Sequence, residues 1–79
     1  AAAGFWVQLG AFRERDGAES FQRHVGAELD WLAPRLGLFS DAALWRLQAG
    51  PYASRDEARA SAERIREALQ LVPVVVERR

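Results

Sequence analysis

The chain contains two copies of one unit, offset by 40 positions. The segment Gln8-Leu9-Gly10-Ala11-Phe12 aligns with Gln48-Ala49-Gly50-Pro51-Tyr52, and Arg15-Asp16 aligns with Arg55-Asp56. Apolar positions keep the same offset: Phe5 with Trp45, Val7 with Leu47, and Val25 with Ile65. A repeated supersecondary unit constrains architecture more firmly than local propensity does. The 79 residues, the length of one domain, therefore form one fold from two similar halves.

Each half begins with a strand pattern and continues with a helix pattern. Apolar side chains alternate with other residues from Phe5 to Gly10 and from Trp45 to Gly50, which is typical of half-buried strands. Apolar residues then recur at helical spacing from Ala18 to Val25 and from Ala58 to Leu69, which predicts two amphipathic helices. Gly26 predicts an early end of the first helix, followed by a further turn.

The second helix has a clear start signal. Ser54 is followed three residues later by Glu57, which predicts a capping box. We expect Trp31, after the first helix, to pack as core.

A closing strand completes each half. We expect these strands over roughly residues 35–39 and 72–76, with Pro73 at an edge position or at the start of its strand because it lacks an N–H. Residues 40–43 predict the turn of a hairpin.

The resulting order, strand-helix-strand-strand-helix-strand, predicts an α+β fold of the ferredoxin-like or RNP-like type. Right-handed crossovers give a four-stranded antiparallel sheet in the order 4-1-3-2, with both helices on one face. We assign residues 5–79 to this domain and residues 1–4 to a linker end or cloning remnant.

The second face of the sheet is left without helices. Alternation directs one set of side chains at the helices: Phe5, Val7, Leu9, Trp45, Leu47 and Ala49. It directs another set at the uncovered face: Trp6, Gln8, Leu44, Arg46 and Gln48, with Phe39 or Arg35 from the second strand. Antiparallel pairing predicts Gln8 near Arg46 and Trp6 near Gln48. An exposed Trp beside amides and a guanidinium is uncommon on a solvent face and indicates a binding surface.

The composition disfavours several classes of function. Eleven basic residues balance eleven acidic ones, so the charge that drives most nucleic-acid binding is missing. There is no cysteine, and His24 alone cannot form a metal site. No apolar run approaches the roughly 20 residues of a membrane span. We expect no nucleic-acid partner, no metal or cofactor, and no direct membrane contact.

Catalysis by this chain is not expected either. The acidic pairs Glu14 with Asp16 and Asp56 with Glu57 lie at helix starts, where they complement the helix dipole rather than form a glycosidase acid pair.

The repeat segments and the helix openings Arg15-Asp16-Gly17-Ala18-Glu19 and Ser54-Arg55-Asp56-Glu57-Ala58 resemble the SPOR (sporulation-related repeat) domain over nearly the whole chain. Within that family, the spacing and the ending Leu71-Val72-Pro73 are most similar to the C-terminal domain of rare lipoprotein A, a peptidoglycan lytic transglycosylase. The catalytic barrel of such a parent would lie outside this chain.

The resemblance implies a function and a location. SPOR domains bind peptidoglycan glycan strands stripped of their stem peptides (denuded strands), which accumulate at bacterial division sites. It therefore implies a non-catalytic, monomeric domain in the periplasm of a Gram-negative bacterium, which brings its parent protein to the septum.

The resemblance also implies site residues. Gln8 matches the family's first-strand glutamine, and Arg46 matches its basic position in the third strand. Ala11 stands where many members have Ser, and Leu44 stands where some have an exposed aromatic, so Trp6 would supply the stacking surface.

The residue types suit a glycan. Gln8 and Gln48 each offer a donor and an acceptor for hydroxyl or acetamide groups. Arg46 favours the free lactyl carboxylate that N-acetylmuramic acid carries once its peptide is gone; relief of steric exclusion by the peptide is the simpler explanation.

Two other classes of function share the fold. A protein-interaction module would use the same sheet face. An RNA-recognition module has the same order of elements but stacks bases on exposed aromatics of its first and third strands. Here the third strand offers Arg46 and Gln48 to the uncovered face.

Overall fold

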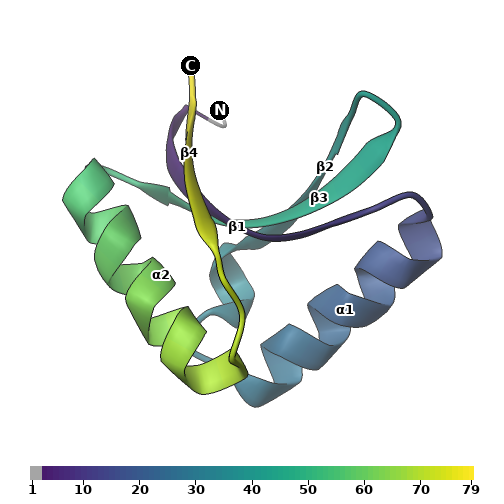
Figure 1. The fold of residues 1–79 in the computed structure, drawn as a ribbon, viewed down its shortest axis with the longest axis horizontal. Helices are drawn as coiled ribbons and strands as arrows, with labels where there is room; N and C mark the ends of the chain where they lie inside the picture. Colours follow the sequence, from purple (N-terminus) through teal and green to yellow (C-terminus); the bar gives the residue numbers. More distant parts are fainter. Residues whose placement is uncertain (1–2) are drawn as a thin grey trace.

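The computed structural model, which describes residues 3–79, contains one antiparallel sheet with two helices on one side (Figure 1). The strands are β1 (Gly4–Phe12), β2 (Leu36–Asp41), β3 (Leu44–Tyr52) and β4 (Val74–Arg78). The helices are α1 (Arg15–Glu28) and α2 (Arg55–Leu69). The strand order β2-β3-β1-β4 is the predicted order, counted from the other edge, so the predicted fold is confirmed.

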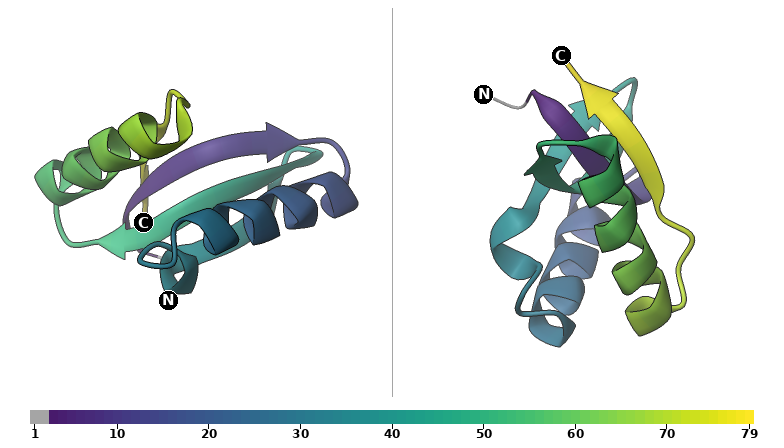
Figure 2. Two further views of the ribbon diagram at one scale, coloured as in Figure 1. Left: turned by 90° about the horizontal axis from the view of Figure 1, so that it is seen from below. Right: turned by 90° about the vertical axis from the view of Figure 1, so that its left-hand side faces the viewer.

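The core lies between the sheet and the two helices, which both cover the same face (Figure 2). Alternate residues of the central strands meet the apolar stripes of the helices because each strand directs every second side chain to that face. The buried core consists of Val7, Leu9, Val25, Leu29, Leu32, Leu47, Ala49, Ala58 and Ile65. Neither helix in residues 3–79 is long and apolar enough to cross a membrane. The other face of the sheet, here called the open face, is not covered by a helix.

The segment after α1 forms the predicted further turn. The helix ends at Glu28, two residues after Gly26, and a short 3₁₀ helix follows at Ala33–Arg35. Leu32 is fully buried between them, and Trp31 packs at the edge of the core under the guanidinium of Arg64, 3.9 Å from its ring centre. The early helix end therefore still delivers apolar residues to the core.

The N-terminus of α2 differs slightly from the predicted capping box. The hydroxyl of Ser54 accepts a hydrogen bond from the Glu57 N–H at 3.1 Å, as expected. The carboxylate of Glu57 accepts from the N–H of Ala53 at 3.0 Å, one residue before the cap. Both interactions satisfy backbone donors at this end of α2, and they hold the helix to the end of β3.

The β2–β3 hairpin is tighter than predicted. Ser40 and Asp41 still pair with Trp45 and Leu44, so the turn consists of Ala42 and Ala43 alone. Both alanines have positive φ, 49° and 68°, as a two-residue type I′ turn requires. The tight turn places Asp41 directly opposite Leu44 at the end of the sheet.

The bounds of β1 and β4 also differ from the predicted ones. β1 begins at Gly4, which pairs with Arg78 of β4. Of the expected linker, residues 1 and 2 lie outside the described residues, and Gly4 is part of the sheet. β4 starts after Pro73 rather than before it, because a proline cannot donate to the ladder. Arg78 consequently joins the strand.

Two irregularities change the register between β1 and β3. Gln8 pairs with Gln48, and Ala11 pairs with Arg46, with shifts between Phe5 and Val7 and between Gln8 and Gly10. The direct partner of Gln8 is therefore Gln48 rather than Arg46, although Gln8 and Arg46 line the same groove. A bulge adds one residue on one strand without a partner, so alternation alone counts the register incorrectly beyond it.

Candidate functional site

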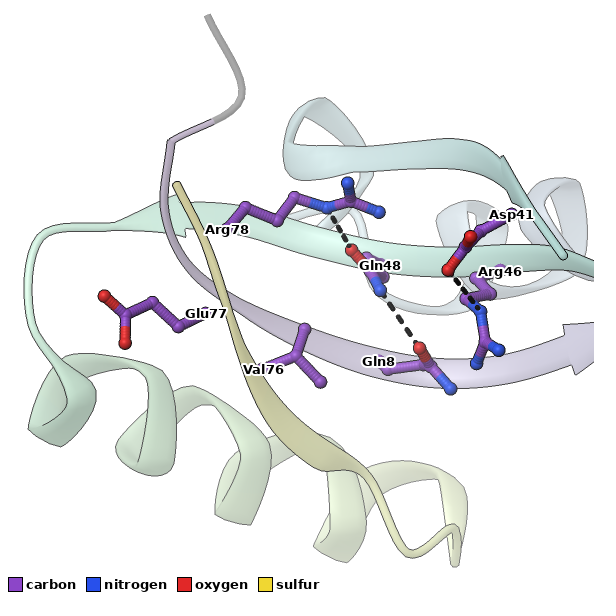
Figure 3. Close-up of a pocket in the computed structure, with 7 residues that line it drawn as sticks. All are labelled: Gln8, Asp41, Arg46, Gln48, Val76, Glu77 and Arg78. Carbon is purple, nitrogen blue, oxygen red and sulfur yellow. Dashed lines mark hydrogen bonds and ion pairs between the residues drawn. The ribbon is translucent and has the colours of Figure 1, made fainter.

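A shallow groove lies on the open face, over β1, β3 and β4 and the end of β2 (Figure 3). Its volume is about 300 Å³. The groove is lined by Gln8, Asp41, Arg46, Gln48, Val76, Glu77 and Arg78. The structure thus brings together three of the six predicted site residues, namely Gln8, Arg46 and Gln48.

A chain of hydrogen bonds crosses the groove from β4 to β1 (Figure 3). Nε of Arg78 donates to Oε1 of Gln48 at 2.9 Å. Nε2 of Gln48 donates to Oε1 of Gln8 at 3.0 Å. Gln48 is only 3% exposed, and both ends of its amide have partners, as a buried amide requires. The Gln8 amide nitrogen is left at the end of the chain and donates to no group within residues 3–79.

Arg46 lies toward the hairpin end of the groove. Its side chain is 27% exposed, and Nε lies 3.7 Å from Oδ2 of Asp41, a distance that makes an ion pair but no hydrogen bond. Nε of Arg46 is buried and, within residues 3–79, has no hydrogen-bond partner. Asp41 is 68% exposed, so solvent screens this pair. Arg46 therefore keeps most of its donor capacity.

Glu77 contributes little negative charge to the groove itself. Its carboxylate lies 3.8 Å from Arg55 and 3.8 Å from Arg79. Figure 3 shows it directed away from Gln8 and Gln48. Two arginines, Arg46 and Arg78, and two carboxylates, Asp41 and Glu77, thus line the groove.

Trp6 is not the exposed stacking surface that the sequence predicts. It lies on the open face but is only 6% exposed, because the ring of Phe39 packs edge-on against it at 5.0 Å. Arg78 covers Phe39 in turn, with its guanidinium 3.8 Å from the ring centre. The backbone of Gly50 closes the other side, where a Cβ would lie 2.8 Å from the Trp6 ring. The expectation of an exposed Trp6 is wrong, and its side chain supports the floor of the open face.

Ala11 and Leu44 lie on the open face but do not line the groove. Ala11 is exposed and pairs with Arg46, because the bulge after Gln8 turns it to this face. Leu44 is partly exposed at the hairpin, opposite Asp41. Both residues lie next to Arg46 rather than next to Gln8.

Three charged residues of the groove, Asp41, Glu77 and Arg78, are not among the predicted site residues. The expected turn over residues 40–43 includes Asp41, which belongs to β2, and the expected last strand ends at residue 76, before Glu77 and Arg78. A signal for Arg78 exists in the alternation of β4, since Val74, Val76 and Arg78 lie two residues apart and pair with the outward positions of β1. Alternation continued past the valines of β4 therefore predicts that Arg78 points to the open face.

The arrangement favours binding of an acceptor-rich ligand. The outward groups are guanidinium N–H donors of Arg46 and Arg78 and the amide N–H donors of Gln8. Carboxylate, carbonyl and hydroxyl oxygens are the complementary groups. Within residues 3–79, no cluster of three or more His, Asp or Glu side chains could hold a metal ion.

Comparisons with known proteins agree with this fold. The peptidoglycan binding domain of the Bacillus subtilis cell wall lytic enzyme CwlC superposes with a TM-score of 0.75 at 24% identity, over 100% of this chain and 95% of that one. The RlpA SPOR domain from Pseudomonas aeruginosa superposes with a TM-score of 0.65 at 28% identity, over 95% of this chain and 100% of that one. No curated protein matches the chain in sequence.

The sequence itself carries the family pattern. The family model of the SPOR domain matches residues 1–77, almost the full length of the chain. The resemblance seen in the two repeat segments is confirmed, and the chain belongs to the SPOR domain family.

Proposed function

We propose that this chain is a non-catalytic, monomeric domain that binds denuded peptidoglycan glycan strands through its open face. The observation that carries the proposal is the groove whose outward groups are hydrogen-bond donors from Gln8, Arg46 and Arg78. A glycan of alternating aminosugars offers acetamide carbonyls, hydroxyls and, once the peptides are gone, a lactyl carboxylate on every muramic acid. The ligand is therefore rich in the acceptor groups that these donors require.

Removal of the peptide matters for two physical reasons. In intact peptidoglycan the lactyl group is a neutral amide, whereas in a denuded strand it is a carboxylate that a guanidinium binds by charge-assisted hydrogen bonds. Removal of the peptide also relieves its steric exclusion from the shallow groove. Arg46 accounts for the first effect and the groove's shape for the second.

Gln8, Arg46 and Gln48 form the polar centre of the proposed site, with Arg78 added from the structure. Ala11 and Leu44 extend it toward the hairpin along the Arg46 side. Trp6 acts beneath this surface, by holding Phe39 and Gly50 in place.

The proposal extends to the parent protein. Solved structures of similar fold come from a cell wall lytic enzyme and from RlpA, which supports a parent that acts on the cell wall. We place this domain in the periplasm of a Gram-negative bacterium, where it targets a peptidoglycan lytic transglycosylase to denuded strands at the division septum.

Retention on purified sacculi tests the proposal. Sacculi are incubated with the domain before and after treatment with an amidase that removes stem peptides. Retention that rises after treatment supports binding to denuded strands. Retention that stays the same or falls contradicts it, and retention in neither case favours a protein partner on the same face.

An RNA partner is disfavoured by the structure of the open face. Trp6, the aromatic side chain of β1 on this face, is 6% exposed and offers no ring to a base. The neutral net charge removes the electrostatic contribution as well.

A further inference from the structure

Gln8 and Gln48 could in principle hydrogen-bond in either direction. A glutamine amide has a donor end and an acceptor end, so a pair of them can exchange roles by rotating both groups. The direction decides which end of Gln8 faces the ligand. If Gln8 accepts, its NH₂ group points outward; if it donates, its carbonyl does.

We propose that Arg78 is a positioning residue that fixes this direction and thereby makes the open face selective for acceptor groups. A guanidinium has N–H donors and no acceptor. Its Nε–H, 2.9 Å from Oε1 of Gln48, therefore requires the carbonyl end of Gln48 on its side. The NH₂ end of Gln48 must then face Gln8, which accepts at 3.0 Å and turns its own NH₂ outward.

Arg78 itself is held in place by an aromatic support. Its guanidinium lies 3.8 Å from the centre of the Phe39 ring, and Phe39 packs edge-on against the buried Trp6 at 5.0 Å. The contact spans the sheet from β4 to β2, over the two central strands. The donor that orients Gln48 is thus fixed by packing and does not depend on a ligand.

The pairing register shows why the two glutamines need a further group to fix the direction of their hydrogen bond. Gly4 pairs with Arg78, and Leu44, at the same position of the second half, pairs with Asp41. Arg78 and Asp41 therefore occupy equivalent places in the two halves, one a donor only and the other an acceptor only. A symmetric pair of glutamines would have no preferred direction, and Arg78, which contacts Gln48 as a donor only, breaks the symmetry.

The direction of the hydrogen bond between Gln8 and Gln48 can be measured without any ligand. In an NMR experiment that detects coupling across hydrogen bonds, the wild type should show Nε2 of Gln48 coupled to the side-chain carbonyl carbon of Gln8. Arg78→Met keeps a long apolar chain over Phe39 but loses the donor, so both directions become populated. This coupling should then weaken, and the reverse coupling, from Nε2 of Gln8 to the side-chain carbonyl carbon of Gln48, should appear. Arg78→Lys, which restores a group with donors only, should bring the wild-type coupling back. An undiminished coupling in Arg78→Met, with no reverse coupling from Gln8 to Gln48, overturns the proposal.

Gln48→Glu should reverse the direction of the hydrogen bond to Gln8 with almost no change in the shape of the side chain. A carboxylate at position 48 accepts from Arg78 with one oxygen and from Gln8 with the other, so Gln8 must donate and turn its carbonyl outward. The NMR coupling should then run from Nε2 of Gln8 to the carboxyl carbon at position 48. Failure of the coupling to reverse in a folded Gln48→Glu variant contradicts the proposed mechanism.

The consequence for binding rests on the proposed glycan function. With a short denuded glycan as probe, Gln48→Glu should lower affinity about ten- to a hundredfold, because one donor becomes an acceptor that faces ligand oxygens. The new negative charge also weakens binding, so the same substitution is measured in a Gln8→Ala background, where only the charge acts. A loss of affinity about tenfold larger with Gln8 present supports the proposal, and equal losses overturn it.

The two failures are distinguishable. If the wild type does not bind the glycan, the proposed function fails, while the NMR couplings still decide whether Arg78 orients the glutamines. If the wild type binds but the couplings do not depend on Arg78, the function stands and the orienting role of Arg78 fails.

Discussion

Gln8 and Gln48, which hold the same position in the two halves of the repeat, hydrogen-bond directly to each other at 3.0 Å in the middle of the sheet. The repeat therefore does more than duplicate a fold, because it brings two equivalent amides together on the open face. Gln48 is buried and serves as the inner member, and Gln8 is the outer member that a ligand can reach.

Removal of the outer amide should weaken binding more than folding. We expect Gln8→Ala to reduce affinity for a short denuded glycan about tenfold, the effect of one lost hydrogen bond to a ligand oxygen. Unfolding free energy should fall by about 1–2 kcal/mol, because Gln48 loses the acceptor for its buried NH₂ group. Calorimetric titration and urea unfolding measure the two effects. Gln22→Ala on α1, in the helical layer, is the matched control, and an equal loss of affinity there would refute the assignment.

Arg46 should discriminate between denuded and peptide-bearing strands. Arg46→Gln removes the charge but keeps a polar side chain, so affinity for the denuded glycan should fall about tenfold, and affinity for the peptide-bearing glycan should change little. Titration of both glycans gives the ratio. Arg64→Gln, which changes an arginine stacked on Trp31 in the helical layer, should leave both affinities unchanged. Equal losses on the two glycans would mean that Arg46 does not recognise the carboxylate.

Asp41 should act against anionic ligands. It lies 3.7 Å from Arg46 and is 68% exposed, so it weakens the local positive potential without making a hydrogen bond. Asp41→Asn should therefore raise affinity for the denuded glycan about two- to fivefold at low salt, and the gain should shrink at high salt because screening removes it. Asp30→Asn, which changes an exposed carboxylate in the turn after α1, is the control. A decrease in affinity for Asp41→Asn would show that the carboxylate itself contacts the ligand.

A side chain at Gly50 should destabilise the fold, because Gly50 lies in close contact with Trp6. A Cβ at Gly50 would lie 2.8 Å from the Trp6 ring and 3.0 Å from the carbonyl oxygen of Phe5, and neither the packed ring nor the backbone can move easily. Gly50→Ala should lower the unfolding free energy by about 1–3 kcal/mol in urea unfolding. Gly17→Ala lies in helix α1 with its nearest contact at 3.9 Å, and should raise it by about 0.5–1 kcal/mol. Unchanged stability of Gly50→Ala would mean that the Trp6 ring is not held as described.

Much of the architecture could be predicted because it depends on local periodicity. The repeat places Gln8 and Gln48 in equivalent strands, and alternation correctly assigns Val7 and Leu47 to the core and Gln8, Arg46 and Gln48 to the open face. These assignments need only that successive strand residues point to opposite sides.

The remaining features depend on contacts between distant segments. The pairing of Gln8 with Gln48 follows from bulges, and nothing in the alternation shows where a strand takes an extra residue. Trp6 is buried because Phe39, from an edge strand, covers it. Arg78 lies beyond the apolar run that marked β4, so its place beside Gln48 became visible only in the folded sheet.

The most direct test of the account is an NMR titration of the isotope-labelled domain with a short denuded glycan, mapped on backbone and side-chain amides. Binding through the open face predicts that the largest shifts occur at the side-chain amides of Gln8 and Gln48 and at the backbone of Arg46 and Arg78. Shifts concentrated on α1 and α2, or no shifts at glycan concentrations in the millimolar range, would contradict it.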